Sequence, residues 1–175
     1  MIKTNRVKWF DRKFPAGLPV EMLPNMIERL RSGPAAYKDR VVSLSKDLLT
    51  HRFGDSWSIQ ENIGHIVDVE PLWLGRVEDF VNGEERLRPA DLANTKTHDA
   101  RHNETPVENL LFELRKLRMQ LISRIEDLSD EELHRSSLHP RLKTPMTVID
   151  LAYFVAEHDV HHLVRINELI ESVST

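Results

Sequence analysis

The chain has 175 residues, nine histidines, no cysteine and a net charge of −4. This length suits one domain over residues 1–175, and no apolar run reaches the ~18 residues that a membrane span needs. The lack of cysteine excludes disulfides, thiolate metal sites and a cysteine nucleophile, and the negative charge gives no reason to expect nucleic acid. The N-terminus lacks the apolar stretch of a secretory signal. We therefore expect a cytoplasmic protein with no nucleic-acid and no membrane partner.

The first part of the chain predicts an irregular arm followed by a broken helix. Residues 1–18 mix basic and aromatic side chains with Pro15 and Gly17 and show no period, so we expect an arm whose aromatic side chains pack on the body. Residues 19–31 carry apolar side chains at helical spacing, and a second helical stretch starts near residue 34. Gly33-Pro34 separates the two stretches, which predicts an interrupted first helix.

The second helix has the clearest start signal in the chain. Ser58 and Glu61 have the spacing of a capping box, and an apolar stripe follows them. The helix should continue to about residue 81, where Asn82-Gly83 ends it. His65 lies on or beside its apolar stripe.

Two more helices follow, each preceded by a long polar connection, residues 83–104 and 129–144. The third helix starts near Thr105-Pro106 and carries apolar residues at heptad-like spacing up to Leu128. The fourth starts at Thr144-Pro145 or Thr147 and ends near residue 171. Four long helical segments without a convincing strand predict an all-α protein, an antiparallel four-helix bundle.

The fourth helix carries an unusual cluster of histidines, His158, His161 and His162. His158 and His162 are four residues apart, so both rings project from one face and interrupt an apolar stripe. Burying two imidazoles is costly without partners, and a divalent metal ion satisfies both acceptor nitrogens. His65 is the only histidine in the middle of another helix, so His65, His158 and His162 are the candidate metal ligands. Three histidines with one open position are typical of a catalytic site.

The other histidines have different interpretations. His161 is turned away from the face of His158 and His162, which favours a supporting or interface role. His98 and His102 are also four apart, but their polar surroundings favour solvated loop residues over metal ligands. Residues 158–162 approximate the zinc-protease motif, with Asp159 in place of the general-base glutamate. This shorter side chain, and the lack of a third-ligand segment, argue against a peptidase.

Taken together, these features resemble the DinB-like family of four-helix-bundle metalloproteins. The resemblance covers about residues 23–169 and rests on Trp57-Ser58, Glu61, His65, Asp68, Trp73, Arg76, Glu157, His158, Asp159, His161, His162 and Ile166. It implies that His65, His158 and His162 bind a divalent ion such as nickel or zinc. Characterised members include transferases and isomerases that use bacterial thiols such as bacillithiol and mycothiol, and the family is often dimeric.

The resemblance therefore implies a metal-dependent enzyme of the thiol S-transferase type. It would take a small-molecule substrate, use a low-molecular-weight bacterial thiol as cosubstrate and form a homodimer. Two alternatives stay open. In a metal-dependent hydrolase, bound water would attack the substrate. In a non-catalytic stress or interaction module, the metal would only stabilise the bundle.

Five residues are candidates for supporting roles around the metal. Glu61, Asp68 and Asp159 are carboxylates that would orient an imidazole or take a proton. Arg76 and Arg165 would hold an anionic substrate group. Simpler structural roles remain for three of them, because Glu61 closes the capping box, Asp159 can face solvent, and Arg76 can pair with Asp79 or another surface carboxylate.

Overall fold

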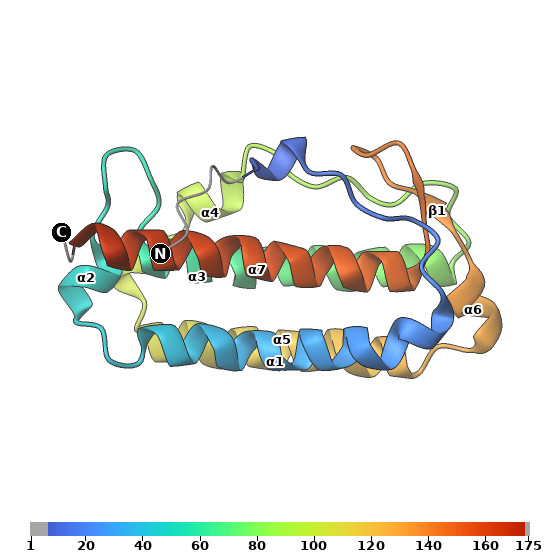
Figure 1. Cartoon of the computed structure of the whole chain (residues 1–175), viewed down its shortest axis with the longest axis horizontal. Helices are drawn as coiled ribbons and strands as arrows, with labels where there is room; N and C mark the ends of the chain where they lie inside the picture. The colour runs from blue at the N-terminus through green and yellow to red at the C-terminus, as the bar shows by residue number, and fades with distance from the viewer. Residues whose placement is uncertain (1–6, 174–175) are drawn as a thin grey trace.

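A computed structural model describes residues 7–173, and four long helices dominate it. These are α1 (Leu23–Val41), α3 (Ile59–Val81), α5 (Val107–Glu126) and α7 (Val148–Val173). Helices α1 and α3 each pack on both α5 and α7, so α1 and α3 lie diagonally across the bundle (Figure 1). The predicted all-α four-helix bundle is confirmed.

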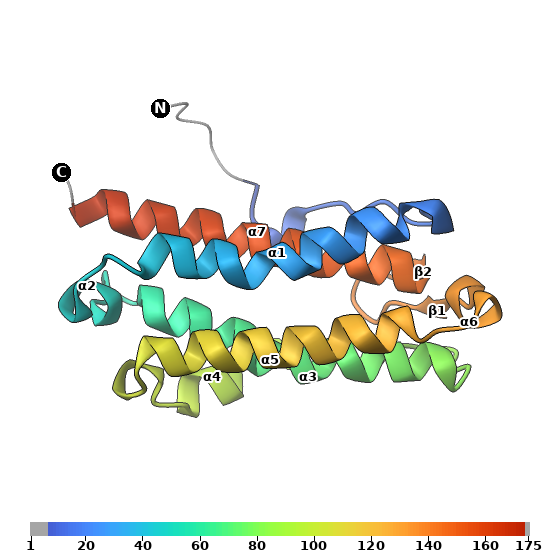
Figure 2. The ribbon, with the colours of Figure 1, turned by 90° about the horizontal axis from the view of Figure 1, so that it is seen from below.

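The connections determine the direction of each helix. Helices α1 and α3 run in opposite directions, as do α5 and α7, whereas the neighbours α1 and α7 run in the same direction (Figure 1). The segment between α3 and α5 returns along the length of the bundle, so these two neighbours run in the same direction (Figure 2). That long return places residues 83–104 along the side of the bundle rather than at one end.

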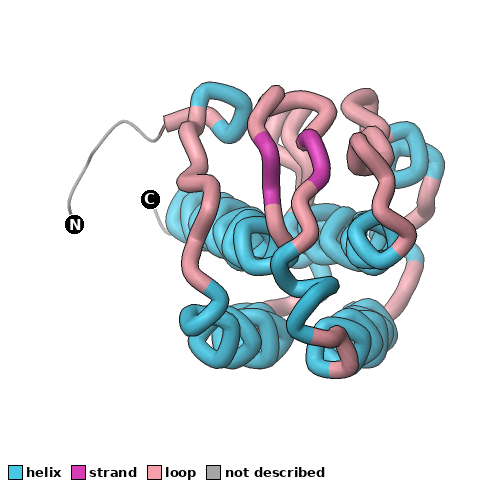
Figure 3. Tube along the Cα trace, turned by 90° about the vertical axis from the view of Figure 1, so that its right-hand side faces the viewer, coloured by secondary structure: helices cyan, strands magenta, loops and turns pink. Residues whose placement is uncertain are grey.

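Several short helices, turns and strands lie outside the four long helices. They are the 3-10 turns η1 (Trp9–Asp11), η2 (Val20–Met22) and η3 (His102–Glu104), the helices α2 (Lys46–Thr50), α4 (Thr95–Asp99) and α6 (Asp130–His134), and the strands β1 (Ser137–Leu138) and β2 (Pro145–Met146). The two strands pair antiparallel and flank the loop 139–144 (Figure 3). The sequence shows no sign of them, because two residues are too few for a period-2 pattern.

The N-terminal arm packs on the bundle, although residues 1–6 of the predicted arm lie outside the described residues. Trp9 contacts Phe14 and Phe154 with ring centroids 5.1 Å apart in each case. Farther along, the backbone N–H groups of Gly17 and Leu18 donate to the carboxylate of Asp150 at 3.0 and 2.9 Å. Figure 1 shows the arm, α4 and the turn beyond β1 on the same side of the bundle.

The predicted interruption of the first helix is wrong, because α1 continues through Gly33-Pro34. Proline has no N–H for the carbonyl four residues earlier, that of Leu30. The buried Arg118 of α5 supplies the missing donor, with its Nη1 3.2 Å from the Leu30 oxygen. Gly33 is needed here because a Cβ on it would lie 2.6 Å from a carboxylate oxygen of Asp159. A contact from another helix thus compensates for the helix-breaking residues.

A buried ionic group divides the apolar core into two clusters. Arg118 pairs with Glu70 and Asp159, and all three side chains are buried. One cluster lies toward the strands and includes Leu30, Phe80, Leu121 and Phe154. The other includes Tyr37, Ile63, Leu114 and Ile166, toward the opposite end of the bundle. Along α3, α5 and α7, the residue of the ionic group comes between these two sets.

None of the helices within residues 7–173 has both the length and the apolar character required to cross a membrane.

Candidate metal centre

Three buried histidines come together between α3 and α7. His65 lies on α3, and His158 and His162 lie one turn apart on α7. Their ring centroids are 5.4 Å apart for His65 and His158, 4.9 Å for His65 and His162, and 4.7 Å for His158 and His162. One ring nitrogen from each lies within 4.8 Å of the others. Separations of this size are compatible with three ligands around one ion.

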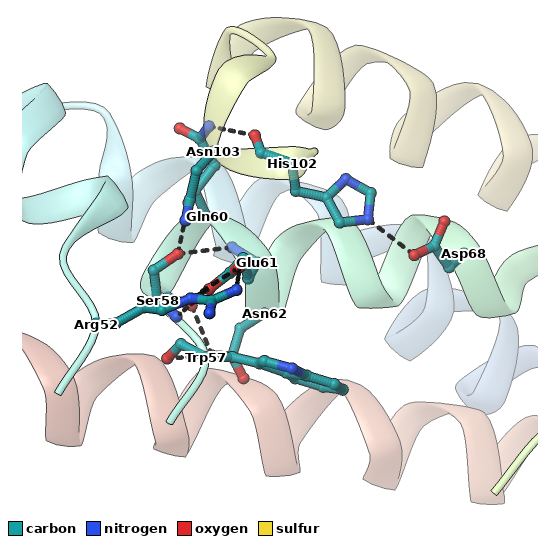
Figure 4. Close-up of polar contacts among 9 residues, drawn as sticks. All are labelled: Arg52, Trp57, Ser58, Gln60, Glu61, Asn62, Asp68, His102 and Asn103. Atoms are coloured by element: carbon teal, nitrogen blue, oxygen red, sulfur yellow. Dashed lines mark hydrogen bonds and ion pairs between the residues drawn. The ribbon is translucent and has the colours of Figure 1, made fainter. Parts of the chain in front are cut away.

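The capping box of α3 sets the register that points His65 inward. Ser58 Oγ accepts from the Glu61 N–H at 3.0 Å, and Glu61 Oε2 accepts from the Ser58 N–H at 2.8 Å (Figure 4). This start fixes the rotation of the helix, because each later residue follows at about 100° per step. His65 therefore faces α7 from the second turn of α3.

A hydrogen-bond chain selects the tautomer of His65. Thr97 Oγ1 donates to Asp68 Oδ2 at 2.9 Å, so its oxygen can accept from His65 Nδ1, which lies 3.1 Å away. His65 Nδ1 then carries the proton, and Nε2 carries the lone pair that a metal needs. Burial lowers the pKa of His65 to about 4, which keeps the ring neutral near pH 7.

Asn62 selects the same tautomer in His162. The amide nitrogen of Asn62 donates to the Ser58 carbonyl at 2.8 Å, so its Oδ1 is the acceptor for His162 Nδ1 at 2.9 Å. In the neutral form of His162, Nδ1 therefore holds the proton and Nε2 holds the lone pair. Hydrogen bonds of this kind orient ligating histidines in known metal sites.

His158 lacks such a partner and is surrounded by aromatic rings. Its centroid lies 5.0 Å from that of Trp9 and 5.6 Å from that of Trp73. Burial lowers its pKa well below the usual value, so the ring is neutral. Nδ1 of His158 is buried without a hydrogen-bond partner among the described residues. An unsatisfied nitrogen on a neutral ring is costly for the protein alone and fits a ligand that the chain does not supply.

A pocket of about 590 Å³ lies against the three histidines. Trp9 of the arm, Trp57 and Trp73 line it, together with Leu72 and Phe154. The pocket is also lined by four cationic side chains, Arg76, Lys96, Arg141 and Lys143. This combination suits a small molecule with an apolar body and an anionic group.

Only one of the three candidate carboxylates lies near an imidazole of the triad. Asp68 accepts from Thr97 and from His102 Nε2, the latter at 2.8 Å. Burial acts to raise its pKa, but the hydrogen bonds from His102 and Thr97 lower it overall, so Asp68 is ionised. It acts on His65 through the hydroxyl of Thr97.

Glu61 and Asp159 have other partners. Glu61 closes the capping box and forms an ion pair with Arg52 (Figure 4). Asp159 was expected beside the metal or in solvent, but it is buried against Arg118, with Oδ2 2.6 Å from Nη1. The reason is the helical step, because the residue after His158 projects about 100° away from the ring of His158 and toward α1 and α5.

Of the two candidate arginines, Arg76 lines the pocket and Arg165 does not. Arg76 is buried and lines the pocket, and its Nε donates to the Arg88 carbonyl at 3.1 Å. Its expected partner Asp79 is held by Arg88 instead. Arg165 binds Glu168 and the hydroxyl of Ser56 and does not line the pocket, so its geometry gives no support to a substrate-binding role.

His102 contradicts the expectation of a solvated loop residue, whereas His98 is exposed as expected. The ring of His102 lies over Gly64, where a Cβ would come within 2.3 Å of it, and its Nε2 binds Asp68 (Figure 4). His161 packs against Trp9 and His162 at centroid distances of 5.3 and 5.0 Å and lines the pocket.

Three residues at the site escape prediction from the sequence, Asn62, Thr97 and His139. Asn62 precedes His65 by three residues and shares its face of the helix, so helical spacing could have identified it. Thr97 and His139 belong to the two polar connections, where no periodicity indicates which side chains turn inward.

Residues 29–166 match the family model described as the DinB superfamily. No curated protein sequence matches significantly. YfiT from Bacillus subtilis, whose structure is described as that of a probable metal-dependent hydrolase with an unusual four-helix bundle topology, has a TM-score of 0.77 and 22% sequence identity. The similarity covers 93% of this chain and 94% of YfiT.

Two further structures share the fold. A mycothiol-dependent maleylpyruvate isomerase has a TM-score of 0.66 and 13% identity, over 84% of this chain and 60% of the isomerase. The colibactin self-resistance protein ClbS, in complex with a double-stranded DNA, has a TM-score of 0.64 and 18% identity, over 85% of this chain and 95% of ClbS. At these identities the similarity establishes the fold alone.

The ClbS complex corrects one expectation from the sequence. The exclusion of a nucleic-acid partner is wrong, because a protein of this fold is seen bound to double-stranded DNA. Net charge sums over the whole surface, whereas contact with phosphates depends on where the cations lie. A net charge of −4 therefore does not exclude a nucleic-acid partner.

Proposed function

This chain belongs to the DinB superfamily, and we propose that it is a divalent-metal-dependent enzyme of the thiol S-transferase type. The observation that carries the proposal is the meeting of three buried imidazoles at the wall of a pocket of about 590 Å³. The proposed ligands are His65, His158 and His162. Nickel or zinc is the proposed ion, because imidazole nitrogen suits both.

The donor set supports a metal rather than a hydrogen-bonded histidine cluster. Asn62 and Thr97 hold the protons of His162 and His65 on Nδ1, and the Nδ1 of His158 has no hydrogen-bond partner among the described residues. In these tautomers the Nε2 atoms of His65 and His162 are both acceptors, and the single N–H group of a neutral His158 ring cannot satisfy both. With three protein ligands, such a site keeps a position for an exchangeable ligand, as catalytic zinc sites do.

The chain's own residues bind and orient the reactants. A bound divalent ion would lower the pKa of a thiol or a water molecule and so supply a nucleophile at neutral pH. The chain has no cysteine, so the sulfur must come from a cosubstrate. Trp9, Trp57 and Trp73 line the pocket with aromatic surface, and Arg76 offers a cation to an anionic group. Asp68 holds His65 in place through Thr97.

Metal-assisted hydrolysis is the second candidate. It needs the same three histidines, but the nucleophile is a water molecule instead of a thiol. The fold similarity to YfiT, described as a probable metal-dependent hydrolase, over 94% of that chain favours it.

Two assays on nickel-loaded and zinc-loaded protein separate these functions. Conjugation of chlorodinitrobenzene that requires both bacillithiol and metal, and that is lost in His158→Ala, would support the transferase. Metal-dependent cleavage of nitrophenyl acetate without thiol would support the hydrolase. His134→Ala changes an exposed histidine and is the matched control. Metal-bound protein that is inactive in both assays would contradict both functions.

A further inference from the structure

Two buried hydrogen-bond donors face one another in the wall of the pocket. Arg76 of α3 and His139 of the turn between β1 and β2 are each 2% exposed. Arg76 Nη1 lies 3.1 Å from His139 Nε2. Both residues line the pocket.

The backbone of the turn fixes the tautomer of His139. Its Nδ1 accepts from the N–H groups of Arg141 and Leu142 at 3.2 and 3.1 Å. The neutral ring must then carry its proton on Nε2, the nitrogen that faces Arg76. A guanidinium has donors only, so two N–H groups meet with no acceptor between them. A buried arrangement of this kind is costly until an acceptor arrives.

Asp79 attracts the positive charge of Arg76 without forming an ion pair with it among the described residues. Asp79, the expected partner of Arg76, is engaged by Arg88 through Oδ1 and Oδ2. No carboxylate among residues 7–173 forms an ion pair with Arg76. Arg141 has a buried Nη2 without a hydrogen-bond partner, and Lys143 lines the same wall. These observations indicate a site that a negatively charged oxygen would complete.

We propose that Arg76, His139 and Arg141 form an oxyanion subsite that binds a carboxylate or phosphate group of the small-molecule substrate or cosubstrate. This inference rests on the proposed function only because it uses the same pocket. Arg76 follows His65 by eleven residues on α3, about three turns or roughly 16 Å along the axis. The ligand is therefore elongated, with its reactive end near the histidines and its anionic end at Arg76.

The electrostatics of the wall agree with this assignment. Burial and the nearby Arg76 lower the pKa of His139 to about 3. Burial also lowers the pKa of Arg76 to about 10. An oxyanion bound between them would raise both pKa values, because it stabilises the protonated forms. The Arg76 guanidinium lies 5.4 Å from the Trp73 ring, so indole fluorescence can report on binding.

Titration of metal-stripped protein with succinate and with inorganic phosphate, followed by tryptophan fluorescence, tests the subsite. Neutral succinamide is the ligand control. Arg76→Gln and, nearer the surface, Arg141→Gln should each weaken binding by at least about tenfold, the effect of losing a hydrogen bond to a charged group. Arg165→Gln removes the same charge outside the pocket and should bind like the wild type. Circular dichroism checks that each variant is folded.

The outcomes separate this inference from the proposed function. Binding that survives His158→Ala but is lost in Arg76→Gln supports the subsite even if the protein proves to hold no metal. Tighter binding of succinate than of phosphate identifies a carboxylate ligand, and the reverse identifies a phosphate. Equal binding by Arg76→Gln, Arg141→Gln and the wild type, or no binding of either oxyanion, overturns the inference.

Discussion

Asn62 determines which nitrogen of His162 carries the lone pair, and its effect illustrates how single residues prepare this site. The Asn62 amide is itself held by the Ser58 carbonyl, so its orientation follows from the start of α3. The hydrogen bond to Nδ1 is 2.9 Å long and buried. The tautomer of a candidate ligand thus depends on a residue that does not touch the proposed metal.

Replacing Asn62 with alanine should weaken zinc binding about 10- to 100-fold, the usual effect of removing a partner that orients a ligating histidine. Competition with a chromogenic chelator measures the affinity. Asn109→Ala, an exposed asparagine on α5, should leave it unchanged. Equal affinities for both variants would show that the Asn62 hydrogen bond does not prepare the site.

His139 makes stability depend on pH. Its pKa in the folded protein, about 3, lies below the ordinary value of 6.5, so the unfolded chain takes up the proton first as the pH falls. The contribution of His139 to the unfolding free energy is complete above pH 6.5 and is lost progressively toward pH 3. Above pH 6.5 this residue should have no effect on the pH dependence.

Urea denaturation of metal-stripped protein can isolate this contribution. Between about pH 5.5 and pH 4, His139→Asn should reduce the slope of unfolding free energy against pH by roughly 1.4 kcal/mol per pH unit, the value for one proton. The exposed His134→Asn should retain the wild-type slope. An unchanged slope in His139→Asn would mean that His139 is not held neutral in the fold.

At the scale of helices, α1 shows why local sequence signals can fail. Gly33-Pro34 predicts a break, yet the helix continues because Arg118, distant in sequence, donates to the carbonyl that Pro34 leaves without a partner. Gly33 allows the carboxylate of Asp159 to approach the backbone of α1. The residues that appear to break the helix are the residues that bring α1 against the ionic group.

The close approach of Asp159 to Gly33 should reverse the usual effect of a glycine-to-alanine change in a helix. Alanine would normally favour the helix by about 1 kcal/mol. Gly33→Ala should instead destabilise the protein, because its Cβ would lie 2.6 Å from Asp159 Oδ2 and 3.0 Å from Arg118 Nη1. Chemical denaturation measures the change, with the exposed Ser32→Ala on the same helix as control. A more stable Gly33→Ala protein would contradict the described contact.

Helical spacing predicts much of the fold and part of the site. The capping box of α3, its end near Val81, the helices α5 and α7, and the meeting of His65 with His158 and His162 all follow from helical patterns, whereas the continuity of α1 does not. The burial of His102 and His139 does not, because both lie in aperiodic connections whose path depends on the whole bundle. The pairing of Asp159 with Arg118 likewise requires knowledge of which helix lies opposite.

Across the whole molecule, the buried group of Arg118, Glu70 and Asp159 separates the two apolar clusters at the level of the histidine site. Asp159 is adjacent to His158 in sequence, and its backbone oxygen accepts from the Tyr37 hydroxyl at 2.9 Å. The ionic group therefore ties α1, α3, α5 and α7 together beside the proposed metal ligands.

Arg118→Met should lower the unfolding free energy by about 3–5 kcal/mol, because it leaves two buried carboxylates without a cation. Burial already raises the pKa of Glu70 with Arg118 present. Arg115→Met, an exposed arginine on the same helix, should have little effect. Denaturant titration compares the two variants, and equal stabilities would contradict a structural role for the ionic group.

We propose above that His65, His158 and His162 together hold a divalent metal ion. Elemental analysis of protein purified without added ions tests it most directly. We expect about one nickel or zinc ion per chain in the wild type and in His134→Ala, and a loss of that ion in folded His158→Ala. A wild-type protein without metal, or an unchanged metal content in His158→Ala, would contradict it.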